Sequence, residues 1–553
     1  MRRKLTRIVA SGLVLAVVTG GQAARAQSPV ARADARRQLL ILTPSGRTYL
    51  RAAPFLAGAA REPMPTASAA PVSKRGRGGL RARSSAHRLS AAGSLQRLER
   101  SGAISSVAYQ SYRSSYLAAQ HTLRKLSGTR RGELGAVLAN IDAMAGAGQF
   151  TPSRLPALML TLERNRQWWS TGPLLGSDQR VSFPGSRIVW EYYPGQGIEI
   201  QWLATFGEAN GYFLSHQDSA LKELLDEVLG LATQRAGGIA WEYLFSFDGG
   251  SPPWTSGLSQ GTALQAFARG WQRLQEPAYL QAAKAAVGIF QTAPPAGVRV
   301  PTSAGAHYLE YTYAPSERII NGFVQAVIGL YDYTKITGDP LGLELFEAGD
   351  AEARAELVHY NTGSWSMYDQ HSESDLNYHE LLTEFLEHLC QRTRQGPPIA
   401  APAGTPPSGP ASGTPVGQSG GSSPASASTA HAAAAAAAAS ENQIPGDEVY
   451  CTTAEEFKAD LHTPPAITLL SHTLRTSSRA GVQFSLSKIS SVSITIRRAN
   501  HTVWSNSASV EGGKPRILWV TPSKPGAYTL TARAVDLTGN ATTTSATIRL
   551  KRH

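Results

Sequence analysis

Four segments in the middle of the chain combine side chains that can move protons with aromatic rings that can stack on sugars. They make poor helices, yet they interrupt a long stretch of helical pattern. Loops of this kind on a helical scaffold are where binding and chemistry usually lie. They are VWEYYPGQGIEIQWLATFGEANG (189–211), GGIAWEYLFSFDGGSPPWTSGLSQG (237–261), HYLEYTYAPSERIINGF (307–323) and YNTGSWSMYDQHSESDLNYHE (360–380).

Between these segments lies a recurring unit of an aromatic-bearing helix, a short polar turn and a second helix. In one copy, Leu221, Leu224, Leu225 and Val228 fall on a single helical face. Such hairpins cannot bury their apolar faces alone and must stack or close. If the hairpins close into a ring, they form an α/α toroid with a cleft suited to a polysaccharide. If they only stack, they form an open solenoid.

The chain is too long for one core, and its composition changes along its length. We expect a multidomain protein, mainly α, followed by an all-β sandwich of Ig-like type. The alternating segments of the tail, such as SVSITIRRA and AYTLTARAVD, lie between turn residues as such a sandwich requires. The expected divisions are 1–26 (signal peptide), 27–95 (basic, low-complexity and mostly disordered), 96–395 (toroid), 396–445 (Pro/Gly/Ser/Ala linker) and 446–553 (sandwich).

The first residues have the pattern of a segment that targets a protein for export. Arg2, Arg3, Lys4 and Arg7 precede an apolar run, and Ala24-Arg25-Ala26 supplies a cleavage site. This is the pattern of a secretory signal peptide, too short for a spanning helix. We therefore expect a secreted, periplasmic or cell-surface protein.

The formal net charge of +13 invites a nucleic-acid partner, but its distribution argues against one. Residues 1–131 carry a net +21, residues 132–395 a net −13 and residues 396–553 a net +5. The helical part is therefore acidic. We favour a solvated or wall-adhering tail as the interpretation of the basic arm. Attachment to a cell wall or surface could use this arm or the β-sandwich.

Two cysteines, Cys390 and Cys451, flank the linker. A disulfide outside the cytoplasm and two buried free thiols are both open. No metal-ligand spacing accompanies them, so no metal site is expected.

Three motifs resemble the C-terminal catalytic domain of D-glucuronyl C5-epimerases. They are PPWTSGLSQGTAL (252–264), EYTYAPSERIINGFVQAVIGLYDY (310–333) and YNTGSWSMYDQHSESDLNYH (360–379), in the family's order and spacing. The resemblance implies inversion of C5 in glucuronic acid residues of a polysaccharide, with no cofactor.

The same resemblance implies the catalytic residues one by one. The family's glutamate corresponds to Glu310, its first tyrosine to Tyr368 in Met367-Tyr368-Asp369, and its second to Tyr378 in Tyr378-His379. Thr312 stands where the family has proline, and the segment between the two tyrosines is shorter than in the animal enzymes. The family also has β-structure upstream of this domain, whereas residues 94–180 here predict helices.

Other residues are candidates for substrate binding. Arg187 and Arg318 could neutralise a uronate carboxylate, or serve structural ion pairs. Tyr193 and Trp254 could stack on sugar faces, or belong to the core. His379 could orient Tyr378 or be an ordinary polar neighbour. Asn321 is expected to cap a helix.

Three functions remain open on these residues. The leading hypothesis is a uronate C5-epimerase acting on an extracellular polysaccharide. A polysaccharide lyase shares its first step, the removal of the C5 proton, but then cleaves the chain. A non-catalytic glycan-binding surface protein is the third.

Overall fold

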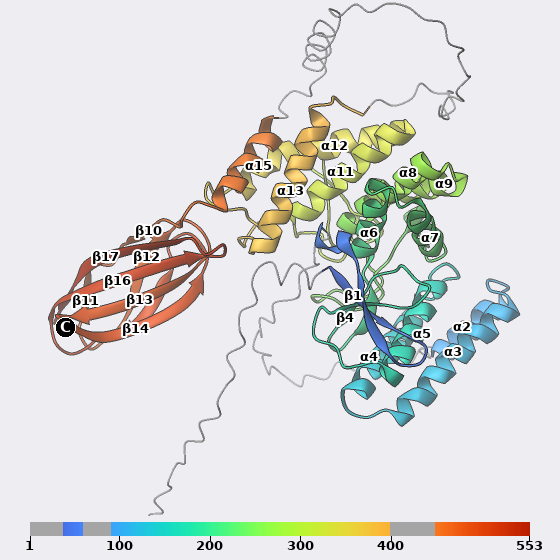
Figure 1. Ribbon diagram of the computed structural model, residues 1–553, viewed down its shortest axis with the longest axis horizontal. Helices are drawn as coiled ribbons and strands as arrows, with labels where there is room; N and C mark the ends of the chain where they lie inside the picture. The colour runs from blue at the N-terminus through green and yellow to red at the C-terminus, as the bar shows by residue number, and fades with distance from the viewer. Residues whose placement is uncertain (1–36, 59–89, 399–447, 553) are drawn as a thin grey trace, which may run out of the picture.

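The computed structural model describes residues 37–58, 90–398 and 448–552. The expected signal peptide lies outside the described residues, as does the expected linker except for residues 396–398. The predicted multidomain organisation, mainly helical with a β-rich C-terminal part, is confirmed. The β-rich part extends away from the helices, and the N-terminal helices lie at the opposite side of the molecule (Figure 1).

A five-stranded sheet precedes the repeated hairpins, with the order β2-β1-β3-β4-β5. Its strands are β1 (Gln38–Leu42), β2 (Thr48–Ala52), β3 (Arg180–Ser182), β4 (Trp190–Tyr193) and β5 (Gly197–Ile200). Leu39 and Ile41 of β1 are buried against Val189 and Ala204. The expectation that residues 27–95 are mostly disordered is therefore wrong for residues 38–58, and β-structure does lie upstream of the hairpins.

Residues 94–180 are largely helical, as expected. They contain α3 (Ser106–Lys125), α4 (Gly128–Gly146) and α5 (Leu155–Thr171), after α2 (Ala91–Arg100). Helices α4 and α5 contact β5, so these helices and the sheet form one N-terminal layer of the helical domain.

The three hairpins predicted from the sequence are confirmed. They are α6 (Trp202–Leu214) with α7 (Asp218–Leu229), α8 (Gly257–Leu274) with α9 (Pro277–Ala286), and α11 (Ile320–Thr337) with α12 (Pro340–Glu356). Helix α8 packs between α6 and α11, and α11 also packs against α13 (Leu376–Thr393). The face of Leu221, Leu224, Leu225 and Val228 is buried. Closure of these helices into a toroid stays a prediction.

The connections before α8, α11 and α13 carry the polar segments that the sequence singles out. They include the hairpins β6 (Thr233–Arg235) with β7 (Gly238–Ala240) and β8 (Arg299–Pro301) with β9 (Ala306–Tyr308), the short helix α10 (Gly288–Gln291), and η2 (Leu357–Tyr360). Because each connection enters the N-terminal end of a central helix, the polar segments share one end of the helical domain.

Helix α15 (Glu448–Asp460) packs on α13, and the Cys390–Cys451 disulfide joins the two. The expected start of the sandwich at residue 446 is therefore wrong, because residues 448–460 complete the helical domain. Their buried face, which includes Tyr450 and Phe457, belongs to its core.

Replacement of both Cys390 and Cys451 by serine is expected to lower the free energy of unfolding by about 2–4 kcal/mol, because the bond closes a long loop in the unfolded chain. The two residues are 61 positions apart. Denaturant titration with and without a reductant measures the change. Equal stability of the oxidised and reduced forms would contradict the expectation.

The C-terminal β domain consists of two sheets around their own core. One has the order β10-β12-β15 and the other β11-β17-β16-β13-β14. The strands are β10 (Ile467–Leu469), β11 (Thr473–Arg475), β12 (Arg479–Leu486), β13 (Ser490–Arg498), β14 (His501–Val510), β15 (Arg516–Val520), β16 (Gly526–Asp536) and β17 (Ala541–Lys551). The Ig-like assignment stays a prediction.

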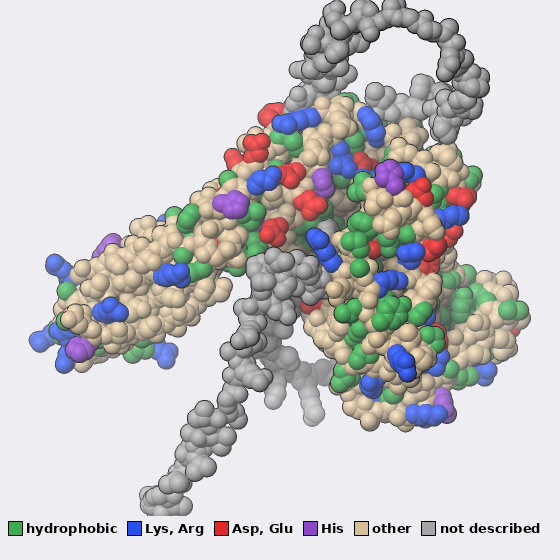
Figure 2. All heavy atoms as spheres, in the orientation of Figure 1, with side chains coloured by type: hydrophobic (Ala, Val, Ile, Leu, Met, Phe, Trp, Pro, Cys, Tyr) green, Lys and Arg blue, Asp and Glu red, His purple; other side chains and the backbone are tan. Residues whose placement is uncertain are grey.

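Charge divides between the two parts of the molecule. Lys and Arg gather at the free end of the β domain, whereas most Asp and Glu visible on the same face lie over the helices (Figure 2). Among the described helices, none is both long and apolar enough to cross a membrane.

Candidate active site

The segments before α11 and α13 are joined by hydrogen bonds. The Ile320 amide donates to the Tyr368 carbonyl over 3.3 Å. The Arg318 amide donates to Gln370 Oε1 over 2.9 Å, and Gln370 Nε2 donates to the Ser316 carbonyl over 2.9 Å. Two motifs about 50 residues apart are thereby held against each other.

Glu310 is buried where its segment meets the first turn of α11, with 3% of its surface exposed. A Cβ at position 322 would lie 2.6 Å from Glu310 Oε2, so Gly322 leaves the space that the carboxylate occupies. A carboxylate beside a helix N-terminus is stabilised by the helix dipole. The glycine of the Asn-Gly-Phe motif thus leaves room for the Glu310 carboxylate.

Tyr378 lies in the first turn of α13 and is buried. Asp375 caps this helix by accepting the Tyr378 amide at 2.9 Å, and Asn321 Nδ2 donates to the Tyr378 carbonyl over 3.0 Å. The expectation that Asn321 caps a helix is wrong, because Ile319 is the N-cap of α11. Asn321 instead fixes the position of Tyr378 relative to α11.

Tyr368 lies between the other two candidates. Its ring centroid is 4.9 Å from that of Tyr378. Burial raises the pKa of Tyr368 well above its ordinary value, and the nearby Glu310 carboxylate and Tyr378 act in the same direction. The three side chains that the motifs single out are therefore neighbours.

His379 follows Tyr378 in α13, and its side chain makes contacts of its own. The Ser366 amide donates to its Nδ1 over 3.2 Å, and its Nε2 lies 2.9 Å from the Phe457 carbonyl, which can only accept. Its ring stacks on Trp365 with centroids 3.6 Å apart. Both ring nitrogens are engaged and the residue is fully buried, so these contacts favour the role of a polar neighbour over that of a residue that binds substrate.

Acidification is expected to destabilise the protein through His379. Burial lowers its pKa to about 4, with Lys488 acting in the same direction. The unfolded chain binds this proton below about pH 6.5 and the folded chain only below about pH 4, so stability falls as pH drops through this window, by about 3 kcal/mol in total. Denaturant titrations from pH 7 to pH 4 measure it. A His379→Gln variant should lose less stability over the same range, and equal losses would contradict the assignment.

The two predicted carboxylate partners are engaged in other contacts. Arg318 Nη1 donates to the Pro315 carbonyl over 2.8 Å within the segment that carries Glu310. Arg187 pairs with Glu223 of α7 over 2.7 Å and lies over the Tyr212 ring, so the structure places it outside the Glu310 cluster. Arg187 is thus an ion-pair residue, the second of the two roles considered.

Tyr193 and Trp254 are core residues. Tyr193 packs on Phe245 with centroids 4.7 Å apart and receives a hydrogen bond from Gln201. Trp254 is 1% exposed and stacks on Tyr243 at 4.3 Å. These contacts favour the core role for both rings, although Trp254 also lines the pocket of about 340 Å³ described below.

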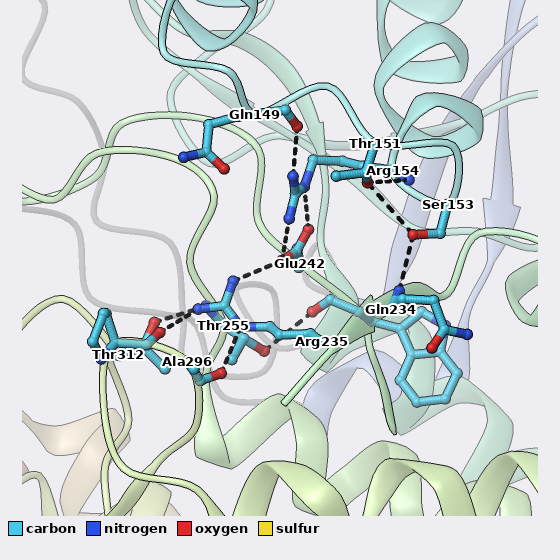
Figure 3. Close-up of polar contacts among 12 residues, drawn as sticks. Gln149, Thr151, Ser153, Arg154, Gln234, Arg235, Glu242, Thr255, Ala296 and Thr312 are labelled. Atoms are coloured by element: carbon cyan, nitrogen blue, oxygen red, sulfur yellow. Dashed lines mark hydrogen bonds and ion pairs between the residues drawn. The ribbon is translucent and has the colours of Figure 1, made fainter. Parts of the chain in front are cut away.

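A buried arginine pair lies in the neighbouring connections (Figure 3). Glu242 accepts from Arg154 Nε at 2.6 Å and from Arg235 Nη1 at 2.6 Å. Arg235 Nε also donates to the Ala296 carbonyl over 2.7 Å. The Glu242 side chain is 1% exposed, so one hidden carboxylate is shared by two guanidinium groups. The two guanidinium groups and the one carboxylate together carry a net charge of +1.

This pair borders a pocket of about 340 Å³. The lining residues include Arg154, Arg235, Ser251, Thr312 and Tyr313, and none of the described lining residues is acidic. Thr312 and Tyr313 belong to the segment of Glu310. The pocket is therefore a cationic recess close in sequence to the candidate catalytic cluster.

Sequence reasoning missed two contributors. Tyr311 is buried beside Tyr368 and its ring stacks with that of Tyr313, with centroids 5.3 Å apart. Its position directly after Glu310 was the feature of the sequence that could have pointed to it. No sequence signal pointed to Arg154, because it lies outside every motif and its partner Glu242 is 88 positions away in the chain. Among the described residues, no group of three or more His, Cys, Asp or Glu could hold a metal ion.

Comparison with known proteins finds a family to which part of the helical domain is similar. Residues 236–398 match the family described as D-glucuronyl C5-epimerase C-terminus. The suspected resemblance is confirmed. A D-glucuronyl C5-epimerase of Caenorhabditis elegans is 29% identical over 131 residues, which cover 21% of this chain and 21% of that protein.

A second relative is an uncharacterized protein of Methanocaldococcus jannaschii, 26% identical over 138 residues, which cover 24% of this chain and 45% of that protein. The chain thus spans about a fifth and about half of the lengths of these two curated relatives. The matched region contains Glu310, Tyr368 and Tyr378, whereas Arg154 and the β domain lie outside it.

Proposed function

We propose that the helical domain is a uronate C5-epimerase acting on an exported polysaccharide that contains glucuronic acid. The observation that carries the proposal is the convergence of Glu310, Tyr368 and Tyr378 within the region that matches the epimerase family. Inversion at C5 needs one group to remove a proton and another to return it from the opposite face of the ring. Three adjacent acid/base side chains meet that need.

Glu310 removes the C5 proton as the base. Tyr368 supplies the new proton, because its raised pKa keeps the phenol protonated at neutral pH. After transfer, Glu310 carries the abstracted proton and Tyr368 is a phenolate, and exchange with water restores both. Tyr378, held by Asn321, orients the ring or shares the proton with Tyr368.

The intermediate gains negative charge next to an existing carboxylate, so cationic groups must offset it. Arg318 lies in the segment of Glu310 and is the proposed partner of the reacting carboxylate. The pocket with Arg154 and Arg235 is the proposed place for the carboxylate of a neighbouring sugar. This arrangement favours a polymer over a single uronate.

Export is supported by two features. The chain begins with a signal-peptide pattern, and Cys390 and Cys451 form a disulfide of the kind that persists outside the cytoplasm. We therefore place the substrate outside the cell or at its surface.

The test is product analysis on a soluble polyglucuronate. We expect nuclear magnetic resonance spectra to show C5-inverted residues in chains of unchanged length. Shortened chains with unsaturated ends would instead establish a lyase. Unchanged polymer across a panel of uronate polymers would overturn the proposal.

A further inference from the structure

The free end of the β domain is densely cationic. Six exposed basic residues lie there, on strand ends and turns that meet at this end: Arg475, Arg479, Arg497, Lys524, Arg549 and Lys551. Figure 2 shows this gathering of Lys and Arg around the chain terminus. We call this set the cationic end.

Strand register brings these charges together. Arg475 of β11 is directly opposite Lys551 of β17, and Arg549 is two positions earlier on the same face. Like charges directly opposite each other in a sheet are unfavourable. A bound anion would offset the repulsion between two such cations and stabilise this part of the sheet.

No acidic residue of the β domain offsets this charge. Of residues 467–552, only Glu511 and Asp536 are acidic, and both lie at the end nearer the helices. Asp536 pairs there with Lys488 over 2.8 Å, and the Gly512 amide next to Glu511 donates to Glu373 of the helical domain. The two ends of the β domain therefore differ sharply in charge.

The cationic end has a structural anchor. The Arg498 guanidinium lies 5.5 Å from the centroid of the Tyr528 ring, and its Nη2 donates to the Pro525 carbonyl over 3.2 Å. These contacts fix the turn that follows β13 against the start of β16. The surrounding exposed cations thus project from a fixed framework.

We propose that the cationic end binds an acidic polysaccharide, namely the uronate polymer on which the helical domain acts. The choice of this polymer rests on the proposed function. Residues 132–395 carry a net charge of −13 and repel a polyanion over most of their surface. A cationic module on the same chain offsets that repulsion and holds the polymer near the acidic domain.

The test measures binding of the full chain to soluble polyglucuronate by titration calorimetry. In one variant, Arg479, Arg497, Arg549 and Lys551 are replaced by Gln. The matched control makes the same change of charge on α2 and α3, at the exposed Arg100, Arg113, Arg124 and Lys125. We expect the first variant to bind about tenfold more weakly or worse, with a reduced salt dependence, and the control to bind like the wild type.

Three outcomes would overturn the inference: equal loss in both variants, wild-type binding no tighter than to a neutral glucan, or tighter binding to anionic vesicles or duplex DNA than to polyglucuronate. Because calorimetry requires no turnover, the two proposals can fail separately. Polyglucuronate binding that depends on the four cations, in a protein that never inverts C5, would remove the epimerase proposal alone.

Discussion

Glu310→Gln is expected to lower the rate of C5 inversion by about 10²- to 10⁴-fold, because the neutral amide cannot accept the C5 proton. The side chains are nearly equal in size, so the space left by Gly322 and the fold around it should be kept. The rate of inversion on polyglucuronate is the measurement, with thermal unfolding as the check that the variant is folded.

A matched control is Glu347→Gln, an exposed carboxylate on α12. It makes the same chemical change away from the cluster and should leave the rate within about twofold. A Glu310→Gln protein that inverts C5 at the wild-type rate would remove Glu310 from the mechanism.

Glu242→Ala is expected to lower the free energy of unfolding by about 3–5 kcal/mol. The substitution leaves Arg154 and Arg235 buried without their shared carboxylate, and an uncompensated buried charge is strongly destabilising. Urea denaturation followed by tryptophan fluorescence measures the loss, since Trp241 and Trp254 lie in the adjacent connection.

The comparison variant is Glu223→Ala, which removes an exposed partner of Arg187. An exposed ion pair contributes about 0–1 kcal/mol, so this variant should remain close to the wild type. Similar losses for Glu223→Ala and Glu242→Ala would show that the Arg154–Glu242–Arg235 network does not stabilise the fold as its burial indicates.

Periodicity and motif order were sufficient for much of the fold and for the catalytic candidates. The spacing of Leu221, Leu224, Leu225 and Val228 predicted a buried face, because a helical period reports burial directly. Glu310, Tyr368 and Tyr378 could be grouped because each lies in a family motif. Their proximity then followed from helix packing that the sequence does not display.

Other features depend on contacts between distant positions. Strand β1 lies within a low-complexity stretch and pairs with β3, about 140 residues later. Helix α15 follows a long linker and returns to α13 through the disulfide. No local pattern reports such pairings, so both were missed.

The aromatic residues show a second limit. Tyr193 and Trp254 have the composition of a sugar platform, but the same ring types fill cores. Burial decides between the two roles, and here their faces are covered by Phe245 and Tyr243. His379 is similar, since its role became clear only from the carbonyl of Phe457, 78 positions away.

The most direct test of the claim that three acid/base side chains surround one uronate C5 is incubation of polyglucuronate with the wild-type protein in heavy water. We expect deuterium at C5 of the inverted residues, none at other carbons, and loss of that label in the Glu310→Gln and Tyr368→Phe proteins. Inverted residues that retain hydrogen at C5, or labelling that persists in both variants, would contradict it.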